Sequence, residues 1–332
     1  MTTAVTETGS PSGLVAGIDV GKSCLDVWVG GQMRSFANDG AGIAAMLQWL
    51  ASRPVSQVVC EPTGGYERPL VQSLSQAGLP VQLAHPNKVR AFARASGQLA
   101  KTDRLDAQML SRYGEVFASA GITPPEPERE ELQSLLRRRR QLADQRVQER
   151  NRLDRAWNPA VRASAQRHID WLDQEIAALD REYREALESS QELSRRAELY
   201  RSVPGIGQLT AAILVADLPE LGRGEGKALC SLVGLAPWSR DSGQQRGYRA
   251  VRGGRGTVRR ALYMAALSVI RGPGELGRFY QGLRQRGKAG KVALVAVMRK
   301  LLLQLHAVAR RGTCWTLNHP TVSPIPNPRP NP

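Results

Sequence analysis

Residues 14–29 read LVAGIDVGKSCLDVWV, and this stretch decides the fold of the first third of the chain. Leu14–Val20 and Cys24–Val29 are short runs rich in apolar and β-branched residues, with a turn at Gly21-Lys22 between them. A third run follows near Met33–Ala37. Short runs of this composition, separated by turn residues, are typical of consecutive strands. The sequence therefore predicts a three-stranded meander at the start of an α/β domain.

Downstream of the meander, helical and strand patterns alternate up to residue 116. Ile43, Met46, Leu47 and Leu50 fall at helical spacing, and the apolar strand Val55–Cys60 ends at Glu61. The pattern then predicts a helix, a strand and two more helices, at Glu67–Gln76, Pro80–Ala84, Lys88–Ser96 and Asp103–Val116. This alternation indicates a mixed α/β domain.

The remainder of the chain is predicted to be helical. The Pro-rich segment 121–127 is the best linker candidate. The leucine-rich region 128–198, whose apolar stripe includes Leu142, Val147 and Leu172, predicts two long amphipathic helices broken near Asn158-Pro159. Such a pair forms either an antiparallel hairpin or an oligomeric coiled coil. Arg137–Arg140 fits a solvated face or a nucleic-acid contact. Beyond residue 200, Gly-rich helical segments lead to an amphipathic helix at Lys291–Arg310.

These shifts in composition divide the chain into five parts. We expect a disordered N-terminus (1–12), an α/β catalytic domain (13–120), a helical coiled-coil or oligomerisation region (121–198), a mainly α-helical C-terminal domain (199–312) and a disordered Pro-rich tail (313–332).

The charge of the chain predicts a polyanionic partner. The 332 residues include 46 Lys plus Arg against 30 Asp plus Glu, a net charge of +16, which favours nucleic acid. The four cysteines are scattered without a C-x-x-C pair, which indicates a reducing compartment and no structural zinc. No signal peptide is recognised at residues 1–12, and the apolar stretch Val292–Ala309 is too short and charged to span a bilayer. We therefore expect a cytoplasmic protein without a membrane partner.

Four carboxylates are candidates for a metal site. Asp19 and Glu61 close two apolar strands, and Asp103 and Asp106 are three residues apart, on one face of a helix. Carboxylates that converge would repel one another unless cations neutralised them, and hard ions such as Mg²⁺ or Mn²⁺ prefer oxygen ligands. Each could equally be an ordinary surface acid or cap. By counting alone, Asp26 and Asp39 are also eligible.

The C-terminal region carries candidates for phosphate binding. Gly205 and Gly207 lie in a segment that fits a helix-hairpin-helix turn or a plain Gly-rich turn, where backbone N–H groups could approach a phosphate. Ser242 in Asp241-Ser242-Gly243 is either a turn residue or a nucleophile surrounded by arginines. Seven arginines and five glycines alternate in the segment around Ser242. The arginines are Arg240, Arg246, Arg249, Arg252, Arg255, Arg259 and Arg260.

Three ordered motifs resemble a known family. They are Gly17-Ile18-Asp19-Val20-Gly21-Lys22, Glu61-Pro62-Thr63-Gly64-Gly65-Tyr66 and Lys101-Thr102-Asp103-Arg104-Leu105-Asp106-Ala107. They resemble the DEDD transposases of bacterial insertion sequences, which include Piv/MooV-type DNA invertases and recombinases guided by a bridge RNA. The C-terminal segments at residues 234–237, 241–243 and 255–262 are similar to the same family.

The resemblance implies a RuvC-like, RNase H-type N-terminal domain in which Asp19, Glu61, Asp103 and Asp106 bind metal. It implies that Ser242 is the nucleophile that forms a phosphoserine link with DNA, with Ser239 as the alternative if one motif is misaligned. Lys101 is expected to contact nucleic acid. Donor and target DNA, a structured guide RNA and a dimeric or tetrameric assembly are the implied partners.

Two other functions fit the same residues. A metal-dependent, junction-resolving nuclease of the RuvC type would use water and would not need Ser242. A non-enzymatic nucleic-acid-binding scaffold would need neither the serine nor the carboxylates.

Overall fold

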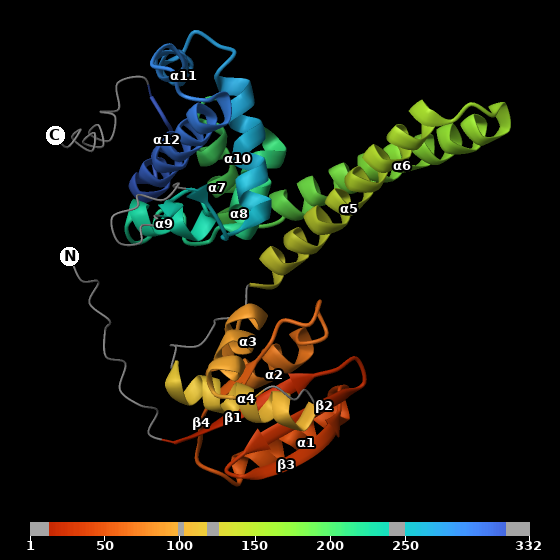
Figure 1. The fold of residues 1–332 in the computed structure, drawn as a ribbon, viewed down its shortest axis with the longest axis vertical. Coiled ribbons are helices and arrows are strands. Elements are labelled where there is room, and N and C mark those ends of the chain that lie inside the picture. Colours follow the sequence, from red (N-terminus) through yellow and green to blue (C-terminus); the bar gives the residue numbers. More distant parts are fainter. Residues whose placement is uncertain (1–12, 99–102, 118–125, 239–249, 317–332) are drawn as a thin grey trace. The chain divides into compact units, whose positions relative to one another are not determined.

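The protein is described by a computed structural model that covers residues 13–98, 103–117, 126–238 and 250–316. The chain separates into two compact units, Met1–Pro125 and Glu126–Pro332, each with its own core (Figure 1). The first unit is a mixed α/β domain and the second is almost entirely helical. This agrees with the predicted change from α/β to helical structure.

A five-stranded sheet forms the centre of the first unit. Its strands are β1 (Leu14–Val20), β2 (Cys24–Val29), β3 (Gln32–Ala37), β4 (Val55–Cys60) and β5 (Val81–Leu83), in the order β3-β2-β1-β4-β5. β1, β2 and β3 are antiparallel neighbours, which confirms the predicted meander. β4 and β5 run parallel to β1, so the carboxyl ends of these three strands lie at one edge.

Helices cover both faces of the sheet. α1 (Gly40–Ala51) and α2 (Arg68–Gln76) pack on one face, where Ile43, Met46, Leu50, Leu70 and Leu74 join the main core of this unit. α3 (Pro86–Ala95) and α4 (Asp103–Val116) enclose the smaller core on the other face. Leu47, predicted to belong to the buried stripe of α1, packs at the edge of the core and is only partly buried.

α4 lies unusually close to β1, because two glycines leave room for it. A Cβ atom on Gly17 would meet the carbonyl oxygen of Ala107 at 2.0 Å, and one on Gly114 would meet Val59 at 2.5 Å. The Ser111 hydroxyl donates a hydrogen bond of 2.8 Å to the Val15 carbonyl. These contacts fix the position of α4 along the axis of β1.

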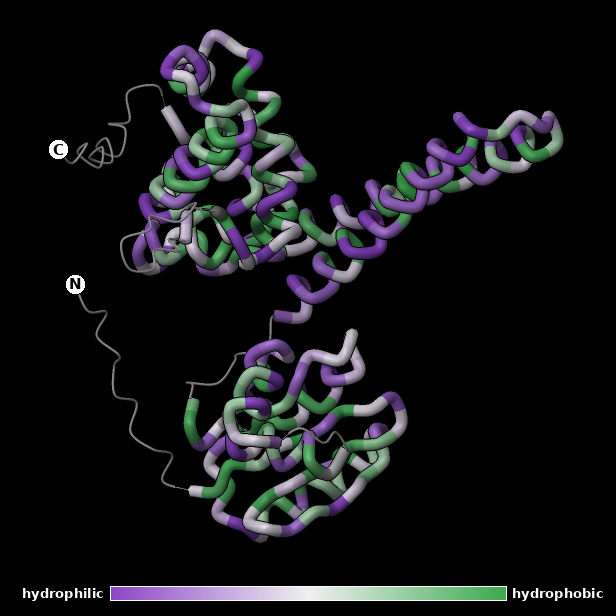
Figure 2. The backbone as a smooth tube through the Cα atoms, in the orientation of Figure 1, coloured by the Kyte–Doolittle hydropathy of each residue, from purple (hydrophilic) through white to green (hydrophobic). Residues whose placement is uncertain are grey.

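The second unit begins with an antiparallel helical hairpin, α5 (Pro127–Arg155) and α6 (Pro159–Glu188). Leu142, Leu172 and Ile176 pack between the two helices. The carboxylate of Asp180 accepts hydrogen bonds from Arg139 at 2.5 and 3.1 Å, which ties the helices side by side. The sequence correctly predicts the break near residue 158, where the Asn158 side chain caps α6. Figure 2 shows how hydrophilic the two helices are.

One residue of the predicted apolar stripe does not belong to it. Val147 is 56% exposed, because its position on α5 faces away from α6. The run Arg137–Arg140 is only partly solvated, since Arg139 pairs with Asp180 and Arg140 donates to the Thr257 hydroxyl at 2.9 Å.

The rest of the second unit packs around two apolar helices. Its helices are α7 (Gln191–Arg201), α8 (Gln208–Asp217), α9 (Gly226–Val233), α10 (Gly256–Val269), α11 (Glu275–Gln285) and α12 (Gly290–Arg311). α8 and α12 contribute many fully buried residues to one core, which also includes Leu132 and Tyr183 from the hairpin. α12 is long and apolar enough to cross a membrane by length and composition, but half of that window is buried inside this core.

A two-stranded sheet interrupts the helices. β6 (Pro237–Trp238) pairs antiparallel with β7 (Ala250–Val251). No strand was expected after the linker, and this expectation was wrong. The strands are two residues long, and they pair across the segment 239–249 without any apolar periodicity that would predict them.

Candidate functional site

The ends of β1 and β4 bring Asp19 and Glu61 to the same edge of the sheet. Gly17 is aligned with Val59 and Ile18 with Cys60, so the next pair along the two parallel strands is Asp19 and Glu61. Side chains alternate between the faces of a strand. Asp19 therefore belongs to the face on which Gly17 meets α4, and both carboxylates are partly buried.

α4 adds its acidic first turn to this edge. Ala107 lies against Gly17, and Gly114 lies against Val15 and Val59, so α4 runs antiparallel to β1. Asp106 precedes Ala107 directly, and Asp103 begins the helix one turn earlier. The start of α4 thus lies at the carboxyl ends of β1 and β4. The ends of β1 and β4 and the start of α4 therefore lie at one edge of the unit.

Glu67, which the sequence analysis assigned no role, organises the loop after Glu61. Its Oε2 accepts hydrogen bonds from the amides of Thr63 and Gly65, at 2.9 and 2.8 Å, and from the Thr63 hydroxyl at 3.2 Å. Partial burial raises the pKa of Glu67, but these hydrogen bonds outweigh it and hold the pKa below its ordinary value. The ionised side chain of Glu67 therefore fixes the backbone that follows Glu61.

Asn38 joins this loop to the end of β1. Its amide donates to the carbonyl of Gly21 at 2.8 Å and to the carbonyl of Tyr66 at 3.2 Å. Cys60, at the end of β4, is fully buried, and its pKa rises to about 12, mainly through burial and secondarily through the charges of Glu67 and Glu61. The edge of the sheet is consequently an acidic environment.

The structure assigns local contacts to the two other eligible carboxylates. Asp39 accepts from the Gly42 amide at 2.8 Å and caps α1. Asp26 lies opposite Asp19 on β2 and accepts a hydrogen bond from the Ser35 hydroxyl. Asp39 is therefore explained by helix capping, whereas Asp26 is a neighbour of Asp19 in the sheet.

The donor set at the edge suits a hard divalent cation, since carboxylate oxygens are the ligands that Mg²⁺ and Mn²⁺ prefer. Among the described side chains, no group of three or more His, Cys, Asp or Glu is arranged closely enough to hold a metal ion. The side chain of Asp103 lies outside that description, as does Lys101. The assignment of all four carboxylates to a metal remains a prediction.

The residues that flank the serine-bearing segment 239–249 lie in the second unit. They are β6, Gly234, β7, Gly254, Arg255 and Arg259, and we call them the loop base. Ser242 and Ser239 fall outside the described residues, as do Arg240, Arg246 and Arg249. β6 and β7 pair at the two ends of this segment. Just beyond β7, a Cβ atom on Gly254 would meet the Gly234 nitrogen at 2.3 Å, so only glycine allows this close approach. The ends of the loop are therefore held together.

Two arginines predicted to bind phosphate make contacts within the protein. Arg255 donates to both carboxylate oxygens of Glu220, at 2.6 and 2.5 Å, and to the Asp217 carbonyl at 2.8 Å. Arg259 donates to the backbone carbonyls of Val233 and Gly253. Both guanidinium groups hold the loop base together. Glu220 lies in the Gly-rich segment Leu218–Cys230, which does not align clearly with the family and was therefore assigned no role. Its contact with Arg255 joins residues 35 apart in the sequence.

The remaining basic and glycine candidates are more exposed. Arg252 is exposed, and Arg260 forms a solvent-exposed ion pair with Asp144 at 3.3 Å. Gly205 has a φ of +86°, and a Cβ atom there would meet Val269 at 1.9 Å, so this glycine is required for packing against α10. Gly207 is the exposed N-cap of α8 and has no neighbour within 4 Å of its Cβ position.

An α/β unit with an acidic sheet edge, combined with a basic helical unit, defines a class of enzyme that processes nucleic acid. Two transposase family models match the chain. The first, for the IS110-type DEDD transposases, matches residues 16–158, and the second, for the IS116/IS110/IS902 family, matches residues 197–281. The chain belongs to this family of insertion-sequence transposases, as its motifs predicted.

Individual relatives agree with this assignment. The chain is similar to the pilin gene-inverting protein of Moraxella bovis, with 29% identity over 312 residues that cover 89% of this chain and 95% of the relative. It is 34% identical to the insertion element IS116 uncharacterized 44.8 kDa protein of Streptomyces clavuligerus, over 44% of this chain and 36% of that protein. It is 23% identical to the transposase for insertion sequence element IS1111A of Coxiella burnetii, over 61% and 62% of the two chains.

Proposed function

We propose that this transposase cuts and rejoins DNA strands through a phosphoserine intermediate, with an RuvC-like acidic site in the first unit and Ser242 in the second acting on the same phosphodiester. The convergence of β1, β4 and the start of α4 at one acidic edge is the observation that carries the proposal. The strand order β3-β2-β1-β4-β5 supports the RuvC-like, RNase H-type assignment of this unit.

In this mechanism the Ser242 hydroxyl oxygen attacks the phosphorus. The bond from phosphorus to the 3′ oxygen breaks, the serine proton is lost, and the 3′ oxygen takes up a proton to become a free hydroxyl. Arginines of the loop would stabilise the charge that develops on the phosphate. The reverse reaction, with a 3′-hydroxyl of another strand as the attacking group, rejoins DNA without an external energy source.

The carboxylates of Asp19, Glu61, Asp103 and Asp106 would hold Mg²⁺ or Mn²⁺, which supplies charge neutralisation at the phosphate when it is bound. Glu67 and Asn38 position these ligands by fixing the loop after Glu61 and its contact with the β1–β2 turn. Neither residue needs to touch DNA in order to support catalysis.

A structured bridge RNA would select the donor and target sequences. The strong positive charge of the chain and its family support this part of the proposal. The sequence also has no C₂H₂ zinc-finger motif through which the protein itself would read bases.

Recombination between two DNA molecules would require a dimer or tetramer, and the α5/α6 hairpin offers a surface for assembly. Trp157 at its tip is 88% exposed, and Val147, Val161 and Trp171 are each exposed by 47% or more. Light scattering of the full chain should give a multiple of 36.3 kDa, and a Trp157→Asp variant should shift it toward the monomer mass. A strictly monomeric wild-type protein bound to DNA would contradict this assembly.

The test of the chemistry is a search for a covalent DNA adduct. Purified full-length protein, RNA transcribed from the flanking non-coding DNA, Mg²⁺ and end-labelled DNA are incubated, and the products are separated under denaturing conditions. We expect an adduct on the peptide that contains Ser242, which is lost in Ser242→Ala and in Asp106→Asn. Ser239→Ala serves as the matched control, because it removes the neighbouring hydroxyl and should leave the adduct.

Other outcomes would decide between the alternatives. Strand cleavage that persists in Ser242→Ala, without an adduct, would replace the covalent mechanism by hydrolysis of the RuvC nuclease type. Biological activity that persists in Asp106→Asn would contradict an enzymatic role for the acidic edge and favour the binding scaffold. An adduct that moves to Ser239 would correct the assignment of the nucleophile.

A further inference from the structure

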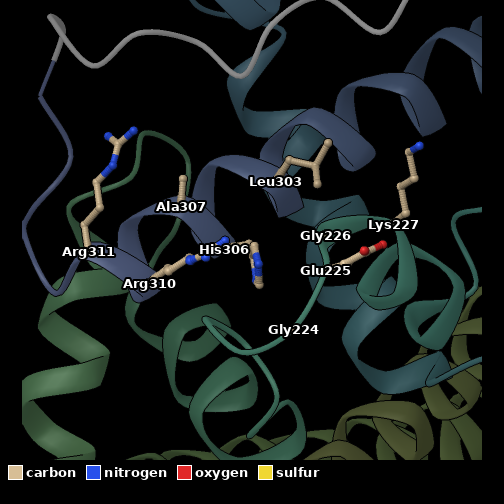
Figure 3. A pocket seen from close by; sticks show the side chains of 9 residues that line it. All are labelled: Gly224, Glu225, Gly226, Lys227, Leu303, His306, Ala307, Arg310 and Arg311. Atoms are coloured by element: carbon tan, nitrogen blue, oxygen red, sulfur yellow. The ribbon is translucent and has the colours of Figure 1, made fainter.

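A basic pocket lies in the second unit, and none of its lining residues belongs to the serine-bearing segment 239–249. It has a volume of about 820 Å³ and lies between the turn that leads into α9 and the last turns of α12 (Figure 3). Nine residues line it: Gly224, Glu225, Gly226, Lys227, Leu303, His306, Ala307, Arg310 and Arg311. The sequence analysis assigned no role to any of these residues.

The start of α9 presents backbone donors to this pocket. Glu225 is the N-cap and makes no side-chain capping hydrogen bond, and the first backbone bond of the helix runs from the Leu229 amide to the Glu225 carbonyl. The amides of Gly226 and Lys227 therefore have no partner within the helix. A Cβ atom on Gly226 would meet Leu303 of α12 at 2.6 Å, so the two helices are in close contact here.

His306 supplies a second and independent feature. Its imidazole is only 7% exposed, and its Nδ1 accepts a hydrogen bond from the Gly222 amide at 3.1 Å. The proton of the neutral ring is therefore on Nε2. Nε2 is buried and has no hydrogen-bond partner among the described residues. Burial lowers the pKa of His306, the nearby backbone of Gly224, which does not reach Nε2 with hydrogen-bond geometry, raises it, and the charge of Arg310 lowers it.

Charged side chains complete the lining. Arg310 extends toward His306, and Lys227 and Arg311 stand at the rim (Figure 3). The lining includes three cationic residues and one acidic residue, Glu225, so the pocket is electropositive. The Nε2–H group of His306, the first amides of α9 and the cationic side chains of Lys227 and Arg310 all favour acceptor oxygens with negative charge.

We propose that this pocket binds a phosphate group of a nucleic-acid strand. The volume far exceeds that of an inorganic phosphate ion and accommodates a nucleotide unit of a chain. Backbone amides at helix N-termini, together with Lys and Arg, are typical phosphate contacts that position a strand without reading its sequence. The inference that the phosphate belongs to a nucleic acid rests on the proposed function. The inference that the pocket binds a phosphate rests only on the residues that line it.

The test compares two double variants with the same loss of charge. Lys227→Gln/Arg310→Gln removes cations from the pocket, and Lys288→Gln/Lys291→Gln removes two exposed lysines around the opposite end of α12. Both are made in full-length protein that carries Ser242→Ala, so binding is measured without strand cleavage. Anisotropy of a fluorescently labelled oligonucleotide, a DNA duplex in one series and the flanking RNA in another, gives the dissociation constants.

We expect the pocket variant to bind the oligonucleotide about tenfold more weakly than its parent, with a salt dependence reduced by about two phosphate contacts. The control should change by about twofold or less. Equal losses in both variants, at unchanged melting temperatures, would overturn the proposal, because general charge would explain the binding. Weak binding by the Ser242→Ala parent itself would count against the proposed function instead.

Nuclear magnetic resonance of the imidazole nitrogens identifies the source of the phosphate. The chain has four histidines, so the His306 signal can be assigned by substitution. We expect it to shift with the oligonucleotide and to be unaffected by the same concentration of inorganic phosphate. A shift with inorganic phosphate that the oligonucleotide does not displace would overturn the nucleic-acid assignment in favour of a free-phosphate site.

Discussion

The acidic edge of the first unit and the basic loop base of the second unit differ in how the chain positions their charges. Asp19 and Glu61 are placed by the register of two parallel strands, and Asp106 is placed by a helix that two glycines hold against those strands. Strand register and close backbone packing bring these residues to one edge. The side chains of Ser111, Glu67 and Asn38 then hold the adjoining backbone.

The loop base in the second unit is organised by side chains. Arg255 forms a bidentate ion pair with Glu220, and Arg259 donates hydrogen bonds to two backbone carbonyls. Arg255 and Arg259, which the sequence predicted to bind phosphate, therefore also stabilise the folded protein. The difference shows that a count of arginines overstates the number available to a nucleic acid, whereas the register of β1 and β4 places Asp19 and Glu61 at the same edge of the sheet.

Among these predictions, Gly17→Ala should change stability and cleavage most, because it acts on the backbone that positions the acidic edge. The new methyl group would lie 2.0 Å from the Ala107 carbonyl oxygen and 2.4 Å from the Ser111 amide nitrogen, so α4 must move. We expect a loss of about 1–3 kcal/mol in the free energy of unfolding, measured by chemical denaturation, together with loss of strand cleavage.

Gly40→Ala is the matched control for that prediction. Gly40 lies in the first turn of α1, has no neighbour within 4 Å of its Cβ position and is exposed. The substitution should leave the free energy of unfolding within about 0.5 kcal/mol of the wild-type value. If Gly17→Ala were equally neutral in stability and in cleavage, close packing of α4 on β1 would not be what positions Asp106.

Much of the first unit could be predicted from sequence. The ranges of β1, β2, β4 and α4 follow from short apolar runs and helical periodicity, and the structure has them at the predicted residues. Those signals are local, and a strand that ends in an acidic residue marks an edge of the sheet. The register then places Asp19 and Glu61, which stand in two of the three family motifs, beside each other.

The second unit was less predictable because its decisive contacts join distant residues. β6 pairs with β7 across the segment 239–249, and no periodicity indicates strands of two residues. The same holds for the contact of Glu220 with Arg255 and for the position of His306 beside the Gly222 amide. Val147 shows the converse error, since an apolar residue near the right spacing is exposed when the partner helix does not cover it.

Arg255→Gln should have a smaller effect that sharpens the distinction between structural and nucleic-acid-binding arginines. It removes a bidentate pair with Glu220 and a hydrogen bond to the Asp217 carbonyl. Both side chains of the pair are about one-third or more exposed, so we expect a loss of only about 1 kcal/mol in the free energy of unfolding at pH 7. Arg252→Gln, at an exposed position in the same segment, should weaken DNA binding and leave stability unchanged.

The pH dependence of the Arg255→Gln effect tests its physical cause. Partial burial raises the pKa of Glu220, but hydrogen bonds and the charge of Arg255 outweigh it, and the pKa lies below its ordinary value of 4.5. A lowered carboxyl pKa stabilises the folded protein fully above the ordinary value, and this stabilisation disappears as the pH falls through the lowered one. The difference in stability between wild type and Arg255→Gln should therefore be constant from pH 7 to about pH 5 and shrink in more acidic solution. If the difference in stability persists unchanged in acid, Arg255 stabilises the fold through its hydrogen bond to the Asp217 carbonyl and its own packing. The ion pair with Glu220 would then contribute nothing, and the guanidinium charge would be available to bind a phosphate.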